Sequence, residues 1–281
     1  MNYILNLLRV RQYYKNLLVF LPLIFVGSFF NLNILIKVII GFIALCFISS
    51  SNYILNDIKD IEKDRQHPEK RLRALASGKV SIKLSVILAV ILFVSSIIIS
   101  SLLSIHFLYS ILALFVLTQA YSFCLKNHPF IDILIISVNF VIRAVSGAFI
   151  IESTLSPWLV SCTFFLALFI VVGKREADSL LLKENSLNHK PVLKYYTKET
   201  NSALMIISTT LIITAYSLYS FLSQYPHLIY TLPFALYVIF RYFYLVEQGS
   251  IIARHPEKLF KDKPITLGLI IWVVSVFIVI Y

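Results

Sequence analysis

The stretch ILIKVIIGFIALCFISSSNYILNDIKDIEKD, residues 34–64, joins a long apolar run to a cluster of acidic side chains. Its apolar part is long enough to cross a bilayer as a helix, which takes about 20 residues. Similar runs recur along all 281 residues, of which 59% are hydrophobic and 14% charged. No segment alternates as a lipid-facing barrel strand does, and a soluble fold would have to bury nearly every run on all sides. The sequence therefore predicts an all-α, multi-pass membrane protein.

The apolar runs between polar breaks predict about nine transmembrane helices in one membrane domain, residues 1–281. These candidate spans are residues 17–31, 34–55, 84–104, 106–124, 131–151, 157–173, 203–223, 228–246 and 265–281. Residues 1–16 read as an interfacial amphipathic helix with Arg9, Arg11 and Lys15 on its polar side. The sequence does not specify an oligomeric state.

Basic residues are confined to alternate connectors. All 25 Lys and Arg residues except Lys37, Arg143 and Arg241 fall in residues 1–16, 56–83, 125–130, 174–202 and 247–264. Because Lys and Arg favour cytoplasmic loops, these connectors are expected on the cytoplasmic side of the cell membrane. Nucleic-acid binding is not indicated, since the charges flank membrane helices without a recognisable binding module.

The acidic cluster at the end of residues 34–64 occupies one side of a predicted helix. At about 100° per residue, Asp57, Asp60 and Asp64 project within about 60° of one another, with Asn56 beside them. Three stacked carboxylates repel unless a cation lies among them, and hard oxygen ligands suit Mg²⁺ bound together with substrate phosphates. A metal site for a diphosphate is therefore predicted from Asn56, Asp57, Asp60 and Asp64. The alternative is a solvated charged helix.

Basic side chains near the acidic cluster, and one inside the membrane, suit an anionic substrate. Arg65, Lys70, Arg71 and Arg73 could bind phosphate groups, although membrane topology alone also explains basic residues at this position. Arg143 lies well inside an apolar run. A charge at that depth is costly unless it is paired or lines a wet cavity, so it indicates an anion site, a structural ion pair or an ion-transport path. Asp132, Asn139 and Ser146 share its helical face.

Motifs along residues 8–200 resemble those of the UbiA superfamily of intramembrane prenyltransferases. NDIKDIEKD, residues 56–64, is similar to the family's NDxxDxxxD motif. LRVRQYYKNLLVF (8–20), DRQHPEKRLRALASGKVS (64–81), YSFCLKNHPFIDI (121–133), FVIRAVSGA (140–148) and GKREADSLLL (173–182) resemble the decaprenyl-phosphate phosphoribosyltransferase branch. This resemblance implies a nine-helix bundle with a polar cavity open to the cytoplasm, capped by loops 56–83 and 174–202.

The resemblance also implies a reaction. A 5-phosphoribosyl group would pass from phosphoribosyl diphosphate to a polyprenyl phosphate, with Mg²⁺ on the departing diphosphate. The implied catalytic residues are Asp57, Asp60, Asp64 and Arg143, and the implied substrate-binding residues are Lys15, Asn16, Arg65, Lys70, Arg71, Arg73, Tyr121, Lys126, Lys174 and Arg175. The alternative is prenyl transfer from a prenyl diphosphate to an aromatic or glycerol-phosphate acceptor.

One position departs from the prenyl-transferring pattern. Members of that kind carry a second aspartate-rich motif near the sixth span, where this chain has Lys174, Arg175, Glu176 and Asp178. A site that binds two phosphorylated substrates has more negative charge to neutralise, and additional cationic side chains suit that requirement.

Overall fold

The computed structural model describes residues 3–66, 70–181, 192 and 195–281. Within these ranges every regular element is an α-helix or a 3-10 helix. Eight of the helices are long and apolar enough to cross a membrane. They match eight of the nine predicted spans, which confirms the all-α membrane class. The chain divides into two compact units, and each is described by itself.

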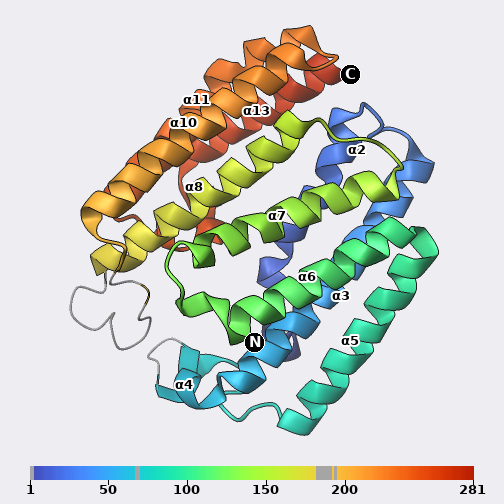
Figure 1. Ribbon diagram of the computed structural model, residues 1–281, viewed down its shortest axis with the longest axis vertical. Helices are drawn as coiled ribbons and strands as arrows, with labels where there is room; N and C mark the ends of the chain where they lie inside the picture. The colour runs from blue at the N-terminus through green and yellow to red at the C-terminus, as the bar shows by residue number, and fades with distance from the viewer. Residues whose placement is uncertain (1–2, 67–69, 182–191, 193–194) are drawn as a thin grey trace. The chain divides into compact units, whose positions relative to one another are not determined.

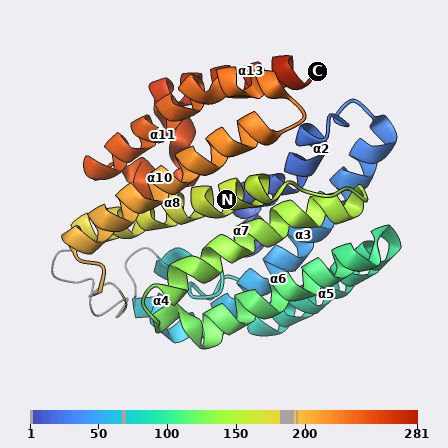
Figure 2. The ribbon, with the colours of Figure 1, turned by 45° about the horizontal axis from the view of Figure 1, so that its top comes forward.

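Unit 1 comprises Met1–Cys124 and Ile142–Ser153. It contains α1 (Tyr3–Leu7), η1 (Val10–Phe20), α2 (Leu21–Phe25), α3 (Leu32–Lys59), α4 (Ile61–Gln66), η2 (Lys70–Leu72), α5 (Ile82–Leu103), α6 (Ile105–Phe123) and the second half of α7 (Ile131–Ile150). In Figures 1 and 2, α3 and α5 lie side by side. Ser51 Oγ donates to Ala89 O at 2.9 Å and Ser96 Oγ to Ala44 O at 2.9 Å, so small polar side chains join this pair of apolar helices.

Unit 2 comprises Leu125–Val141 and Thr154–Tyr281. It contains η3 (Leu125–Asn127), the first half of α7, α8 (Pro157–Leu181), α10 (Lys198–Leu222), η5 (Pro226–Thr231), α11 (Leu232–Glu247), α12 (Ile251–Arg254), η6 (Pro256–Lys261) and α13 (Lys263–Ile280). Local chemistry explains where its long helices begin. Pro157 opens α8, Thr197 Oγ1 accepts from Thr200 N at the start of α10, and Asp262 Oδ1 accepts from Ile265 N at the start of α13.

The N-terminal segment differs from the prediction. Instead of one helix over residues 1–16, the chain forms α1, breaks at Arg9, and continues as η1. Arg9 has φ 52 and ψ 44, a left-handed conformation that no α-helix can pass through. The predicted span 17–31 is likewise made of the end of η1, the short α2 and a turn. The interfacial position of residues 1–16 and the count of nine helices remain predictions.

The two predicted capping loops are partly helical. In 56–83, α3 runs on to Lys59 and is followed by α4 and η2, while in 174–202 α8 runs on to Leu181 and α10 begins at Lys198. Residues 67–69, 182–191 and 193–194 of these loops lie outside the described residues. The capping role and the single membrane domain remain predictions.

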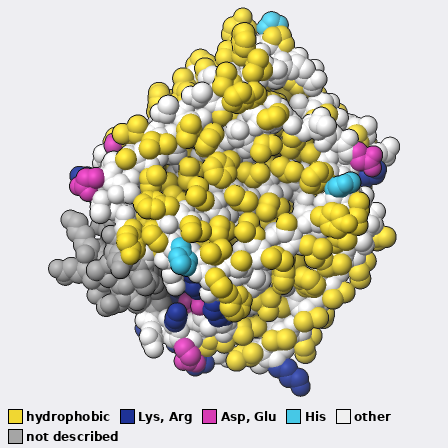
Figure 3. Space-filling view, in the orientation of Figure 1, with side chains coloured by type: hydrophobic (Ala, Val, Ile, Leu, Met, Phe, Trp, Pro, Cys, Tyr) yellow, Lys and Arg dark blue, Asp and Glu magenta, His cyan; other side chains and the backbone are white. Residues whose placement is uncertain are grey.

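The long helices expose apolar side chains. Figure 3 shows hydrophobic side chains over most of the face in view. On α5, Val90 and Ile91 are 55% and 54% exposed. Aliphatic surface of this extent suits contact with lipid, which confirms that these helices are membrane-spanning in character.

Gly147 is required where η1 crosses α7 within unit 1. A Cβ atom there would lie 2.0 Å from the backbone carbonyl oxygen of Val19. Because backbone cannot move aside as a side-chain tip can, Gly147→Ala is expected to destabilise the protein by about 1–3 kcal/mol. A lower melting temperature in detergent would show this.

Gly41→Ala is the matched control. The one close approach to its Cβ would be the terminal Cδ1 of Ile150, at 2.3 Å, and that side chain can rotate; Cγ1 of Ile150 and Cζ of Phe107 would lie at 3.5 Å, in ordinary contact. The intrinsic preference of helices for Ala over Gly then offsets the contact, so a small change is expected. Equal melting temperatures for the two variants would contradict the close approach at Gly147.

Candidate functional site

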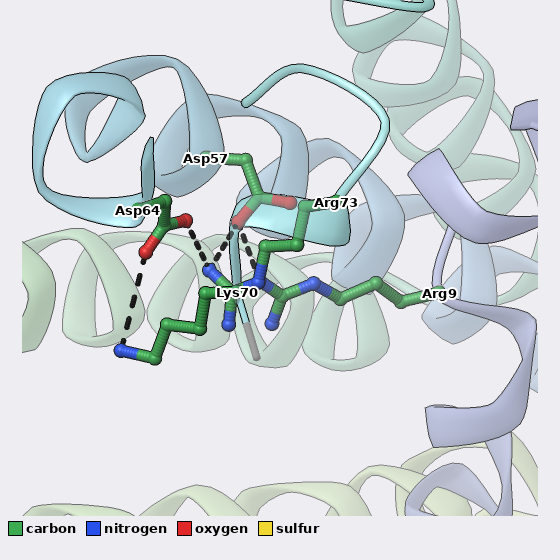
Figure 4. Close-up of polar contacts among 5 residues, drawn as sticks. All are labelled: Arg9, Asp57, Asp64, Lys70 and Arg73. Carbon is green, nitrogen blue, oxygen red and sulfur yellow. Dashed lines mark hydrogen bonds and ion pairs between the residues drawn. The ribbon is translucent and has the colours of Figure 1, made fainter. Parts of the chain in front are cut away.

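Five charged side chains of unit 1 form an ion-pair cluster, here called the Asp57–Asp64 cluster. Asp57 lies in the last turn of α3, Asp64 in α4, Lys70 in η2, Arg73 just after η2 and Arg9 between α1 and η1. Figure 4 shows the two carboxylates directed toward the guanidinium groups of Arg73 and Arg9. One residue separates the end of α3 from the start of α4, and Asp57 and Asp64 both lie within hydrogen-bond distance of Arg73.

Arg73 joins the two carboxylates. Its Nη1 donates to Asp57 Oδ1 at 3.0 Å and to Asp64 Oδ2 at 2.6 Å. Arg9 Nη2 donates to the same Oδ1 of Asp57, and Lys70 Nζ lies 4.0 Å from Asp64 Oδ1. Asp57 and Asp64 are 4% and 3% exposed, whereas the side chains of Arg9 and Arg73 are 21% and 26% exposed. Buried carboxylates are thus held by cations that solvent or a ligand can reach.

Arg9 reaches Asp57 from a strained backbone. A non-glycine residue in the left-handed region costs roughly 1–2 kcal/mol. Its guanidinium lies over the ring of Tyr53, 4.8 Å from the centroid, and this stacking adds to the ion pair with Asp57. Strain that neighbouring contacts maintain is typical of functional positions.

The chain turns at Asp60, between α3 and α4. The predicted helical face assumed one continuous helix, but α3 ends at Lys59 and Asp60 is its C-cap, with φ −94 and ψ 9. Its backbone N–H donates to Asn56 O at 3.0 Å. Among the residues that the structure describes, no three His, Cys, Asp or Glu side chains are grouped so that they could hold a metal ion. The continuous helix assumed for the three-carboxylate face is therefore interrupted at Asp60, and the metal-ligand roles of Asn56, Asp57, Asp60 and Asp64 remain predictions.

The cluster is chemically suited to a divalent cation. Oxygens of Asp57 and Asp64 converge on one positively charged nitrogen, so the same two carboxylates can share a cation. Mg²⁺ is commonly bound through one or two carboxylates with water and substrate phosphates completing its ligands. The donor set fits a two-carboxylate magnesium site.

Arg143, the predicted intramembrane cation, lies in a second polar group of unit 1. It is 7% exposed, and its Nε donates to Asn16 Oδ1 at 2.9 Å. Ser49 Oγ donates to the same oxygen at 3.3 Å, and Asn16 Nδ2 donates to Cys46 Sγ at 3.4 Å. The structure therefore brings together Asn16 and Arg143, two predicted site residues that are 127 positions apart.

Unit 2 contains a separate buried ion pair between α7 and α8. Arg175 Nε and Nη2 lie 3.1 and 2.9 Å from Asp132 Oδ2. The hydroxyl of Tyr196 donates to Asp132 Oδ1, and Phe130 N donates to that hydroxyl at 3.0 Å. Burial and the neighbouring Asp132 carboxylate raise the pKa of Tyr196, so its hydroxyl keeps its proton at neutral pH. Asp132 is completely buried and accepts from two side chains.

Asp178 has partners in the same unit. Arg254 Nε donates to Asp178 Oδ1 at 3.2 Å, and Arg175 Nη1 lies 4.0 Å from Asp178 Oδ2. In the α8 segment that stands in place of a second aspartate-rich motif, Arg175 is therefore paired with Asp132 and Asp178 with Arg254. The polar face predicted for α7 is divided, with Asp132 bound to Arg175 and Arg143 bound to Asn16.

The remaining predicted residues lie at more open positions. Arg65 is exposed and its Nη1 donates to Glu62 Oε1 at 2.9 Å. Arg71 and Lys174 are exposed, whereas Lys15, Tyr121 and Lys126 are intermediate. Their substrate-binding roles stay predictions.

Sequence reasoning did not assign Arg9, Tyr196 or Arg254 to a site. Arg9 was grouped with the surface charges of residues 1–16, and no sequence signal marks its left-handed backbone. Tyr196 lies 64 residues from Asp132, and Arg254 lies 76 from Asp178. The only sequence feature that indicated such pairs was the concentration of Lys and Arg in connectors that also contain acidic residues.

Eight apolar helices, with ion pairs buried beside them, define an integral membrane protein. The model of the UbiA prenyltransferase family matches residues 17–260, and the chain belongs to this family of membrane transferases. It is 32% identical to the decaprenyl-phosphate phosphoribosyltransferase of Mycolicibacterium smegmatis, over 99% of this chain and 92% of that protein. It is 31% identical to the Corynebacterium glutamicum protein of the same name, over 98% of this chain and 85% of the relative.

Solved structures agree with the fold. A UbiA homolog from Archaeoglobus fulgidus bound to GPP and Mg²⁺ has a TM-score of 0.75 at 16% identity, covering 98% of this chain and 99% of that one. A UbiA homolog from Aeropyrum pernix K1 has a TM-score of 0.63, also at 16% identity, covering 96% and 97%. The predicted UbiA-like bundle is confirmed.

Proposed function

We propose that this protein transfers a 5-phosphoribosyl group from phosphoribosyl diphosphate to a polyprenyl phosphate, releasing diphosphate. The observation that carries the proposal is the 32% identity to a decaprenyl-phosphate phosphoribosyltransferase over nearly the whole of both chains. Lys174 and Arg175 of α8 support it, because they are cationic side chains where prenyl-transferring members are expected to carry a second aspartate-rich motif. The active site is proposed to face the cytoplasm.

The Asp57–Asp64 cluster is proposed to receive the diphosphate of the donor. Asp57 and Asp64, with Asn56 and Asp60 as further candidates, would hold Mg²⁺, which would neutralise the negative charge that develops on the leaving diphosphate. Lys70 and Arg73 would contact its oxygens, with Arg65 and Arg71 nearby in sequence. The family neighbour from Archaeoglobus fulgidus has Mg²⁺ bound with GPP, which supports a divalent cation here.

The acceptor requires binding rather than deprotonation. A phosphate monoester is already anionic near neutral pH, so no general base is needed, and positioning with charge neutralisation should account for the rate. Arg143 and Asn16 are proposed to orient an anion in unit 1, and Lys126, Lys174 and Arg175 to hold the remaining phosphate charge. Lys15 and Tyr121 complete the proposed set. Direct displacement predicts inversion, hence a β-linked product from the α donor.

The alternative is prenyl transfer from a prenyl diphosphate to an aromatic or glycerol-phosphate acceptor. The UbiA family assignment favours it as a class. It uses the lipid as donor, whereas the proposed reaction uses the lipid as acceptor.

A labelled-donor assay separates the two reactions. Purified protein in detergent is incubated with radiolabelled phosphoribosyl diphosphate and polyprenyl phosphates of several lengths, with Mg²⁺ or with a chelator. The proposal expects lipid-soluble label with Mg²⁺ and none with the chelator. Label absent at every chain length, together with turnover of a labelled prenyl diphosphate, would establish the alternative, and an α-linked product would exclude direct displacement.

A further inference from the structure

The Asp57–Asp64 cluster holds more positive than negative charge. Arg9 and Arg73 both donate to Oδ1 of Asp57, Arg73 also donates to Asp64, and Lys70 approaches Asp64 (Figure 4). Three cationic side chains thus face two carboxylates. Two guanidinium groups on one oxygen repel each other, which weakens the hold of each.

A divalent cation and Arg73 compete for the same oxygens. Mg²⁺ binds oxygen at about 2.0–2.1 Å. Nη1 of Arg73 already lies 3.0 and 2.6 Å from the two carboxylate oxygens that would bind the ion. An ion on both oxygens would have to lie in the place of this nitrogen or directly against it, and both are positively charged. Arg73 in this position and a metal ion shared by Asp57 and Asp64 therefore exclude each other.

We propose that Arg73 and Arg9 are exchangeable counter-ions of Asp57 and Asp64: they give up these carboxylates when a divalent cation binds and then bind the phosphate oxygens that accompany it. This inference rests on the proposed function for the identity of the cation and the diphosphate. It adds Arg9 to the residues that bind substrate.

The exposure of the side chains fits an exchange. The Arg9 and Arg73 side chains are 21% and 26% exposed, so a ligand can reach them, while the side chains alone of Asp57 and Asp64 are 5% and 4% exposed. Arg9 lies on the link between α1 and η1, not inside a long helix, so its side chain can turn without moving one.

The exchange couples the two ligands. A metal ion that binds alone must displace Arg73 and leaves guanidinium groups without an anion. With diphosphate present, the same groups acquire phosphate oxygens, so metal and diphosphate strengthen each other's binding by one common factor. Coupling of this kind is typically 5–150-fold.

The first measurement uses Mn²⁺ alone, counted as free ion by electron paramagnetic resonance, on purified protein without substrate. Arg73→Gln removes the competing cation and is expected to raise Mn²⁺ affinity about tenfold, a coupling of about 1.4 kcal/mol. Arg9→Gln removes one of two partners of Asp57 and is expected to give a smaller rise. Lys63→Gln, an equal charge change at an exposed residue of α4, the helix that contains Asp64, is expected to stay within about twofold.

The second measurement repeats the titration with inorganic diphosphate and Mg²⁺, read as the rise in melting temperature. Arg73→Gln is expected to bind the pair more weakly than the unaltered protein, reversing the order seen with Mn²⁺ alone. Mn²⁺ affinity unchanged or lowered in Arg73→Gln overturns the proposal, because a residue that only positions the carboxylates gives that result. If Arg73→Gln does not fold, Arg9→Gln decides by the same criterion.

Neither measurement uses phosphoribosyl diphosphate or a lipid. If the Mn²⁺ pattern holds and no labelled lipid forms in the transfer assay, the counter-ion exchange stands and the proposed donor is wrong. If labelled lipid forms and the Mn²⁺ affinity of Arg73→Gln is not raised, the proposed donor stands and the counter-ion exchange is wrong.

Discussion

Asp64→Asn is expected to lower turnover in the labelled-lipid assay by about 10³-fold while the protein remains folded. The substitution keeps the shape of the side chain and removes the charge that would hold a divalent cation. Asp64 is 3% exposed and binds Arg73 and Lys70, and Arg73 also binds Asp57. Arg73 keeps its bond to Asp57 in the variant, which preserves the local fold. Raising the Mg²⁺ concentration should recover part of the loss.

Glu62→Gln is the matched control. It lies in the same α4, changes charge equally, and is exposed with Arg65 as its partner. Turnover within about twofold of the unaltered protein is expected, since exposed charges are screened.

Asp60→Asn tests the remaining sequence prediction: a loss as large as that of Asp64→Asn would make Asp60 a ligand despite its place at the end of α3. More than a tenth of normal turnover in Asp64→Asn would exclude it as a metal ligand.

Hydropathy was sufficient to find α3, α5, α6, α7, α8, α10, α11 and α13, because a bilayer-length apolar run has few alternatives to a helix. For residues 17–31 it did not predict the type of helix. Composition is insensitive to the hydrogen-bond pattern, and this segment continues the 3-10 helix η1 into the short α2 at Pro22. The break at Arg9 was also invisible, since arginine is not a residue that marks a left-handed turn.

In the candidate site, helical spacing identified polar residues that share a face of one helix. It could not identify their interaction partners on other helices. Asp57 and Asp64 were placed on one face by spacing, yet they meet through the turn at Asp60 and through Arg73. Arg143 was recognised from its depth in an apolar run, and its contact with Asn16 required the fold. The sequence thus located the charged groups, while their pairing depended on tertiary structure.

Asp132→Asn is expected to destabilise the protein by about 3–5 kcal/mol, the usual cost of leaving a buried charge without its partner. Asp132 is 0% exposed, and Arg175, at 5% exposed, is paired with it at 2.9 Å. The neutral amide cannot balance the guanidinium in an apolar surrounding. The melting temperature in detergent measures the effect. Arg241→Gln breaks a more exposed Arg–Asp pair in the same unit, with side chains 28% and 11% exposed, and a much smaller decrease is expected.

The double substitution Asp132→Asn with Arg175→Gln separates a structural ion pair from a substrate-binding arginine. Removing both charges leaves two neutral groups that can hydrogen-bond, so the double variant should be more stable than Asp132→Asn alone. If Arg175 also binds substrate phosphate, this recovery of stability brings no recovery of turnover, because the cation is still missing. Stability and turnover restored together would make the pair structural and remove Arg175 from the substrate site. A double variant destabilised by as much as the sum of the two single variants, or by more, would contradict the ion pair itself, since two charges that balance each other cost less to remove together than the sum of their separate removals.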